Sequence, residues 1–122
     1  MKVLLINPEK LIQPPFGLLY IGSTLKADGH EVKIFEIPFS IERDSYITLV
    51  REQIQKFSPR IIGITCMSMQ TSIVKDLARD IKEKFKGALL IVGGVHPTID
   101  SHDPVSWGAD IAVRGEAEDT VL

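Results

Sequence analysis

The segment from residue 89 to residue 98, LLIVGGVHPT, places residue types that contact ligands directly behind a continuous apolar run. Such a run is typical of a strand buried on both faces of a sheet. Open α/β sheets bind their ligands at the carboxyl ends of these strands, and Gly93, Gly94 and His96 follow there. Paired glycines let the backbone approach a large ligand closely, but a tight turn without a ligand needs the same residues. Both explanations stay open on this pattern alone.

Several other kinds of site are disfavoured by the residues found at the expected positions. Asn7 follows the first apolar run without a G-x-G-x-x-G fingerprint, and no Walker loop occurs anywhere in the chain. A phosphoacceptor domain needs an aspartate where Thr65 and Cys66 stand. Cys66 has no basic partner nearby in the sequence, which favours a small buried thiol over a nucleophile. An enzyme with its own catalytic groups is therefore the weakest hypothesis, because no acid–base pair, activated nucleophile or metal-ligand cluster is found.

The elements that position these residues follow from alternating strand and helix patterns. Short runs rich in β-branched residues predict strands at 2–6, 31–36, 60–65, 89–92 and 110–113. Apolar residues that share one helical face predict three helices between them, around residues 18–25, 47–57 and 73–85. Gly29 is predicted to cap the first helix, and Asp44 or Ser45 the second. A fourth, shorter helix over 103–107 could equally be a loop.

Strands separated by helices imply right-handed crossovers and a parallel sheet covered on both faces. We therefore predict an α/β fold, a flavodoxin-like three-layer sandwich with a five-stranded parallel sheet of order 2-1-3-4-5. In this topology the loops after strands 1, 3, 4 and 5 meet at the carboxyl edge of the sheet. These loops are residues 7–17, 66–72, 93–100 and 114–119. Residues 116–122 resemble the opening turn of a fifth helix, so we expect 1–122 to be one domain cut from a longer protein.

Composition limits the partners and the compartment of this chain. With 122 residues, of which 44% are hydrophobic, it fits one compact domain. A net charge of −2, from 14 basic and 16 acidic residues, disfavours nucleic acid as a partner. One cysteine cannot build a disulfide framework or a cysteine-ligated cluster, which suits a cytoplasmic location. No apolar run approaches the roughly 20 residues that span a bilayer, so no membrane association is expected.

A resemblance to a known family runs along nearly the whole chain. Its parts are L-L-I-N-P, P-P-F-G-L-L-Y-I-G-S-T-L, G-H-E-V, S-P-R-I-I-G-I-T, L-L-I-V-G-G-V-H-P-T and G-A-D-I-A-V-R-G-E-A-E, in this order. The series resembles the N-terminal cobalamin-binding domain of radical S-adenosylmethionine (SAM) enzymes, which perform methyl transfers or ring-forming oxidations. In that family a C-terminal radical SAM barrel carries a C-x-x-x-C-x-x-C motif that is missing here. The resemblance implies a non-catalytic cofactor module, with the [4Fe-4S] cluster and SAM bound by the absent barrel.

The resemblance further implies how cobalamin is held. The wider group of cobalamin proteins carries D-x-H-x-x-G after strand 1, where the histidine replaces the nucleotide base on cobalt. Residues 7–17 contain no histidine. The expected state is therefore base-off cobalamin without a histidine ligand. The competing hypothesis is a flavodoxin-like regulatory or interaction domain without a bound cofactor.

Each predicted contact has a structural alternative. Ser68 and Thr71 could bind the cofactor tail or cap a helix, and Met67 and Met69 could pack on the corrin or fill the core. His96 is expected to donate or accept a hydrogen bond, with metal coordination disfavoured. Gly93 and Gly94 are implied to admit the nucleotide tail, while Arg114 and Glu116 could pair locally or face the missing barrel. The complete predicted cofactor-binding set is Asn7, Pro15, Phe16, Gly17, Thr65, Met67, Ser68, Met69, Thr71, Gly93, Gly94, His96, Pro97, Thr98, Arg114, Gly115 and Glu116.

Overall fold

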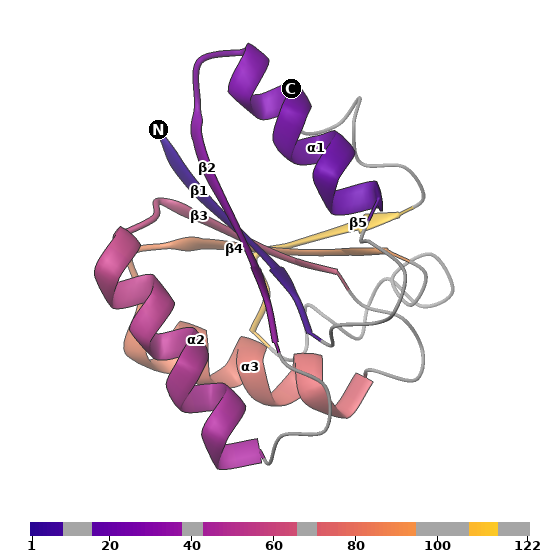
Figure 1. The fold of residues 1–122 in the computed structure, drawn as a ribbon. Coiled ribbons are helices and arrows are strands. Elements are labelled where there is room, and N and C mark those ends of the chain that lie inside the picture. The colour runs from indigo at the N-terminus through magenta and orange to yellow at the C-terminus, as the bar shows by residue number, and fades with distance from the viewer. Residues whose placement is uncertain (9–15, 38–42, 66–70, 95–107, 115–122) are drawn as a thin grey trace.

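The computed structural model describes residues 1–8, 16–37, 43–65, 71–94 and 108–114 as an alternation of strands and helices (Figure 1). All five strands are parallel and form one sheet of order β2-β1-β3-β4-β5. This result confirms the predicted flavodoxin-like fold. The elements are β1 (Lys2–Asn7), α1 (Phe16–Ala27), β2 (Glu31–Glu36), α2 (Arg43–Phe57), β3 (Ile61–Thr65), α3 (Thr71–Lys84), β4 (Leu89–Gly94) and β5 (Ile111–Arg114).

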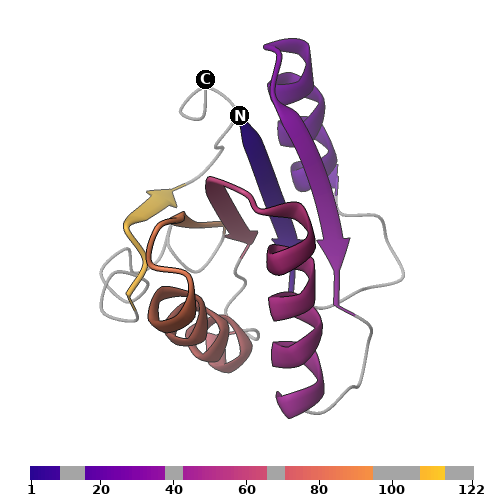
Figure 2. The same cartoon turned by 90° about the vertical axis from the view of Figure 1, so that its left-hand side faces the viewer.

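Helix α1 lies on one face of the sheet, and α2 and α3 lie on the other (Figures 1 and 2). The interior strand β1 is buried from Val3 to Asn7, and its side chains alternate between the two faces. Leu4 and Ile6 belong to the larger core beneath α2 and α3, while Val3 and Leu5 pack with Leu25 of α1. Both sides of β1 are thus covered by helices, as its nearly continuous apolar sequence requires.

Helix α1 ends in the predicted glycine cap. Gly29 has a φ of +91°, in the left-handed region that favours glycine. Its N–H donates to the carbonyl of Lys26 at 3.0 Å, and the N–H of His30 donates to the carbonyl of Leu25 at 3.1 Å. This pair of bonds is a Schellman motif, which satisfies two carbonyls at the helix end.

The predicted element boundaries differ from the observed ones at several places. Strand β1 ends one residue later than predicted, β3 begins one residue later, and β5 is shifted by one residue. Asp44 and Ser45 were expected to cap the second helix from outside, but α2 begins at Arg43 and contains both residues in its first turn. Strand β4 continues through Gly93 and Gly94, which were expected to follow it, because their backbones still pair with β5. The segments 103–107 and 116–122, predicted as a short helix or loop and as a helix start, lie outside the described residues.

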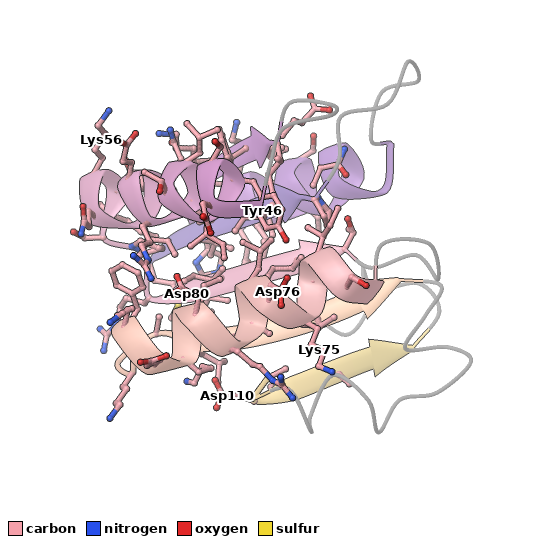
Figure 3. All side chains as sticks on the ribbon, turned by 90° about the horizontal axis from the view of Figure 1, so that it is seen from below. Tyr46, Lys56, Lys75, Asp76, Asp80 and Asp110 are labelled. Atoms are coloured by element: carbon pink, nitrogen blue, oxygen red, sulfur yellow. The ribbon has the colours of Figure 1, made fainter. Side chains whose placement is uncertain are left out.

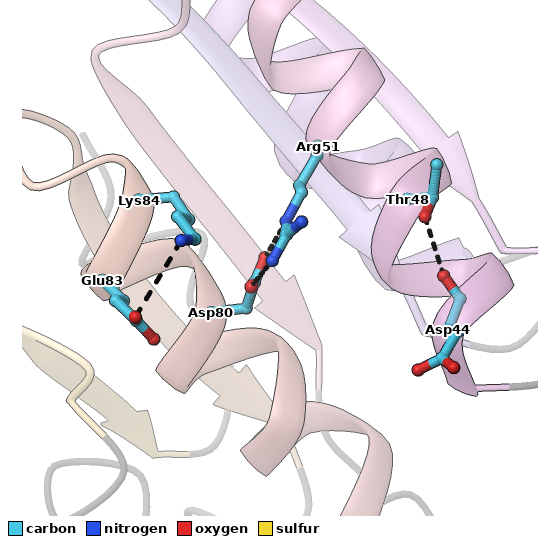
Figure 4. Close-up of polar contacts among 6 residues, drawn as sticks. All are labelled: Asp44, Thr48, Arg51, Asp80, Glu83 and Lys84. Carbon is cyan, nitrogen blue, oxygen red and sulfur yellow. Dashed lines mark hydrogen bonds and ion pairs between the residues drawn. The ribbon is translucent and has the colours of Figure 1, made fainter.

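Helices α2 and α3 are joined by polar side chains across their interface. The Arg51 guanidinium makes a two-pronged hydrogen bond with the Asp80 carboxylate, with Nε to Oδ2 at 2.9 Å (Figure 4). One helical turn nearer the carboxyl edge, Tyr46 Oη donates to Asp76 Oδ2 at 3.2 Å (Figure 3). Planar pairing of arginine with carboxylate fixes both distance and orientation. The two contacts therefore set how the helices lie side by side beneath the sheet.

Asp110, immediately before β5, ties the last strand to α3 and β4. Its Oδ2 accepts hydrogen bonds from the Leu90 N–H and from Lys82 Nζ, both at 2.8 Å. Burial alone would raise the pKa of Asp110, but the Leu90 hydrogen bond and the Lys82 ammonium outweigh it and lower that pKa. A lowered pKa means that the carboxylate contributes stability above its unfolded-state pKa of about 3.9, and that this contribution is lost as pH falls further.

Gly63 in β3 has a packing explanation. A Cβ atom at this position would lie 2.9 Å from Leu5 Cδ2 on the neighbouring strand. Leu5 is 5% exposed and packs in the cluster beneath α1, so it has little space to move away. A glycine inside a strand often marks such a close approach. The small residue at 63 therefore allows Leu5 to occupy the face that α1 covers.

We predict that Asp110→Ala lowers the free energy of unfolding by about 1–2 kcal/mol at pH 7. Hydrogen bonds to a charged group contribute about 1.5–3 kcal/mol when buried, and partial exposure reduces this. The deficit should shrink as pH falls below about 4, where the unfolded-state carboxylate becomes protonated, and it should vanish only below the lowered pKa of the folded carboxylate. Urea unfolding at several pH values measures both effects. Asp28→Ala, at an exposed aspartate, is the control, and an equal pH dependence in both variants would contradict the assignment.

We predict that Gly63→Ala destabilises the fold by about 1 kcal/mol, because overpacking of a filled site outweighs the gain in backbone stiffness. The cost should fall in a Leu5→Val background, because valine lacks the Cδ2 methyl group that makes the contact. Thermal or urea unfolding of the four proteins in this double-mutant cycle measures the coupling. Equal costs in both backgrounds would show that the Leu5 contact is not the cause.

Candidate ligand site at the carboxyl edge of the sheet

The candidate site lies where the parallel strands end and their order along the sheet changes direction. β1 pairs with β2 on one side and with β3 on the other, so the connections from β1 and β3 leave in opposite directions across the sheet. Open α/β sheets bind ligands in the crevice at such a point. Asn7, Thr65, Gly94 and Arg114 are the last residues of β1, β3, β4 and β5 and therefore end at this edge.

A row of four residues crosses this edge on the face that carries α1; we call it the terminal row. Its members are Glu36 of β2, Asn7 of β1, Thr65 of β3 and Gly93 of β4. The register pairs Asn7 with Glu36 and Thr65 with Gly93. Asn7 follows the Ile6–Ile64 pair, so it stands beside Thr65. The row thus presents a carboxylate, an amide, a hydroxyl and a bare backbone in sequence.

Asn7 lies between Glu36 and Thr65 in this row. It is 7% exposed, and among the described residues it is the one side chain with an amide or a charge that is buried. Its Nδ2 donates to Glu36 Oε2 at 3.3 Å, and its backbone carbonyl accepts from the Ile37 N–H at 3.0 Å. A buried amide costs free energy unless it is hydrogen-bonded, and the Glu36 contact reduces this cost for Asn7.

The structure brings together the predicted residues that it describes. Asn7, Thr65, Gly93, Gly94 and Arg114 end neighbouring strands at one edge. Phe16, Gly17 and Thr71 open the helices that follow β1 and β3, and the structure describes their backbone positions. The remaining predicted residues lie outside the described part of the chain: Pro15, Met67, Ser68, Met69, His96, Pro97, Thr98, Gly115 and Glu116.

Sequence reasoning missed Glu36. Strand 2 lies at the end of the sheet order, and the loop that follows it was not among those expected to converge on the site. The one available signal was positional, since Asn7 and Glu36 are both final residues of adjacent parallel strands. Register then places them side by side.

The described residues contain neither a cluster of metal ligands nor a helix suited to crossing a membrane. No group of three or more histidine, cysteine, aspartate or glutamate residues in this part of the chain is arranged to hold a metal ion. Among the helices described, none combines the length and apolar character that crossing a membrane requires.

Solved structures share this fold. The radical SAM methyltransferase TsrM from Kitasatospora setae, solved with cobalamin and a [4Fe-4S] cluster, aligns with a TM-score of 0.82 at 22% identity. The alignment covers 98% of this chain and 23% of TsrM. A CheY-like protein, TadZ of Pseudomonas aeruginosa, aligns with a TM-score of 0.67 at 13% identity over 100% of this chain and 96% of its own. Both likenesses concern the fold.

Curated relatives match by sequence. An anaerobic magnesium-protoporphyrin IX monomethyl ester cyclase from Synechocystis sp. is 32% identical over 99% of this chain. An uncharacterized methyltransferase from Pyrococcus horikoshii is 30% identical over 97%. The chain spans about a quarter of the length of these relatives, 26% and 27% respectively.

The family model described as the B12 binding domain matches residues 2–122, which is nearly the entire chain. This match agrees with the candidate ligand site at the carboxyl edge of the sheet. It also confirms the resemblance to the cobalamin-binding domains of radical SAM enzymes. The chain belongs to the B12-binding domain family.

Proposed function

We propose that this chain binds cobalamin at the carboxyl edge of its sheet and serves as the cofactor module of a radical SAM methyltransferase or cyclase. The observation that carries the proposal is the terminal row, which lies at the switch in strand order within a chain of the B12-binding family. Bound cobalamin would supply the cobalt chemistry, and the chain would hold and orient it.

The residues present suit such a ligand. Corrin carries neutral amide side chains around its ring, and the amide of Asn7 and the hydroxyl of Thr65 can exchange hydrogen bonds with neutral amides. Gly93 adds no side chain next to Thr65, so a large ligand can approach the backbone there. The row contains no pair of groups arranged for acid–base catalysis, which suits a module that holds a cofactor.

The sheet face beyond this row is apolar. Leu89 and Ile91 lie on the same face of β4 as Gly93, and Ile111 of β5 pairs with Ile91. Leu89 and Ile111 remain 37% and 43% exposed, because α1 packs over β1 and β2 instead. The nucleotide tail carries a flat aromatic base, which gains from contact with an apolar surface. This face therefore supports a place for the tail behind Gly93.

The proposed binding state is base-off, without a protein histidine on cobalt. Residues 7–17, which follow β1, contain no histidine to replace the nucleotide base. His96 stands two residues after Gly94, and we assign it a hydrogen bond to the cofactor. In the reduced cobalt(II) form, a coordinated imidazole nitrogen would split each axial electron paramagnetic resonance line into three, so this assignment expects unsplit lines.

We predict that the chain binds hydroxocobalamin and displaces its lower base. Titration followed by the visible spectrum measures affinity and base ligation together, and electron paramagnetic resonance of the reduced complex reports nitrogen coordination. Absence of binding at millimolar cofactor would favour the alternative, a regulatory or interaction domain with this fold. Binding with a base-on spectrum would overturn the base-off assignment alone.

We predict that Gly94→Leu abolishes cobalamin binding while the thermal transition stays nearly unchanged. A bulky side chain at the last residue of β4 would occupy the space through which the ligand approaches the backbone. Gly87→Leu is the matched control, because a Cβ there meets nothing within 4 Å and Gly87 lies before β4, at the opposite edge. Intact binding combined with a large loss of stability would instead show that Gly94 is needed for folding.

A further inference from the structure

The orientation of the Asn7 amide is the feature that requires explanation. An asparagine amide has a donor end, Nδ2, and an acceptor end, Oδ1, and rotation by 180° exchanges them at little steric cost. At the switch in strand order, the end that faces a ligand decides which groups the ligand must offer. Something must therefore select one orientation over the other.

Glu36 makes this selection in the structure. Its Oε2 lies 3.3 Å from Asn7 Nδ2, on the neighbouring strand and on the same face of the sheet. An ionised carboxylate accepts hydrogen bonds and cannot donate them. The flipped amide would place Oδ1 against Oε2, two acceptors in contact, at a site where Asn7 is 7% exposed. Glu36 therefore holds Nδ2 on its own side and sets Oδ1 on the other side of the Cβ–Cγ axis.

Glu36 is the last residue of β2, opposite Asn7, and its side chain is half-buried, unlike the exposed Glu31 at the other end of the same strand. A carboxylate that is partly buried beside an apolar sheet costs free energy that a leucine or threonine would not. The hydrogen bond from Asn7 offsets part of this cost.

We infer that Glu36 is a positioning residue for cobalamin: it orients the Asn7 amide so that one defined end meets the amide groups of the corrin periphery. This inference rests on the proposed function. Glu36 acts through Asn7, so removing Glu36 matters as long as Asn7 is present. The structure thus assigns a role to a residue outside the loops that converge on the site.

The test is a double-mutant cycle on hydroxocobalamin affinity with Glu36→Ala, Asn7→Ala and the double variant. Glu36→Ala should weaken binding about threefold to tenfold, the effect of about one neutral hydrogen bond. The double variant should bind no more weakly than Asn7→Ala, because the two residues act as one unit. Additive losses would mean that Glu36 contacts the cofactor independently, and an unchanged Glu36→Ala affinity would also overturn the inference.

Two matched variants test whether an acceptor that cannot donate is required. Glu36→Gln can donate to Oδ1 as well as accept from Nδ2, so it no longer favours one amide orientation and should bind within about twofold of Glu36→Ala. Glu31→Ala removes a glutamate from the far end of the same strand and should leave affinity unchanged. If Glu36→Gln binds as tightly as wild type, the carboxylate does not set the amide orientation, and the positioning role is wrong.

A second measurement does not depend on the cofactor. In the ligand-free protein, nuclear magnetic resonance should show Asn7 side-chain amide protons that exchange slowly in wild type and rapidly in Glu36→Ala. Rapid exchange in wild type would overturn the inference even if cobalamin binds. Slow exchange lost in Glu36→Ala, together with no cobalamin binding, would show that the proposed function has failed while the Glu36–Asn7 orientation stands.

Discussion

The burial of β1 on both faces is the constraint on which the rest of the structure depends. Five consecutive residues, Val3 to Asn7, are buried, with Leu4 and Ile6 facing α2 and α3 and Val3 and Leu5 facing α1. A slip of one residue would exchange the two faces and expose both sets to the wrong helices. The register of β1 against β2 and β3 is therefore fixed by packing. That register, in turn, brings Asn7 beside Glu36 and Thr65.

The two edges of the sheet use their polar groups differently. At the amino edge, Asp110 joins Leu90 and Lys82, and the Gly29 cap closes α1 with two backbone hydrogen bonds. These groups satisfy one another and add stability. At the carboxyl edge, a buried polar amide, Asn7, and a residue without a side chain, Gly93, stand at positions where apolar residues would pack better. Such departures from the best local choice are expected at functional sites.

The fold was predictable because its signals are repeated along the chain. Strand and helix periodicities alternate, and the handedness of parallel crossovers leaves few arrangements of the strands. Boundaries were less predictable. Gly93 and Gly94 are poor strand formers, but their pairing with β5 uses backbone groups that every residue has, so β4 continues through them. Asp44 and Ser45 are good capping residues, yet α2 begins one residue before Asp44.

The site was predictable in part. Asn7, Thr65 and Gly93 could be assigned to one edge because each ends a strand whose type is clear from sequence. Glu36 could not be assigned to the site from the sequence. Its 3.3 Å contact with Asn7 joins residues 29 positions apart, and it forms only when β1 and β2 are paired in register. A glutamate at a strand end is ordinarily a solvated charge, and no local pattern distinguishes it from Glu31.

The terminal row offers groups that can hold a ligand by hydrogen bonds. Its described groups are a neutral amide, a hydroxyl, a bare backbone and one carboxylate that is held against the amide. Such groups can hold a neutral ligand from one side through hydrogen bonds, but they offer no acid–base pair or nucleophile. In the proposed function this row would hold the cofactor, and the chain spans about a quarter of the length of its curated relatives.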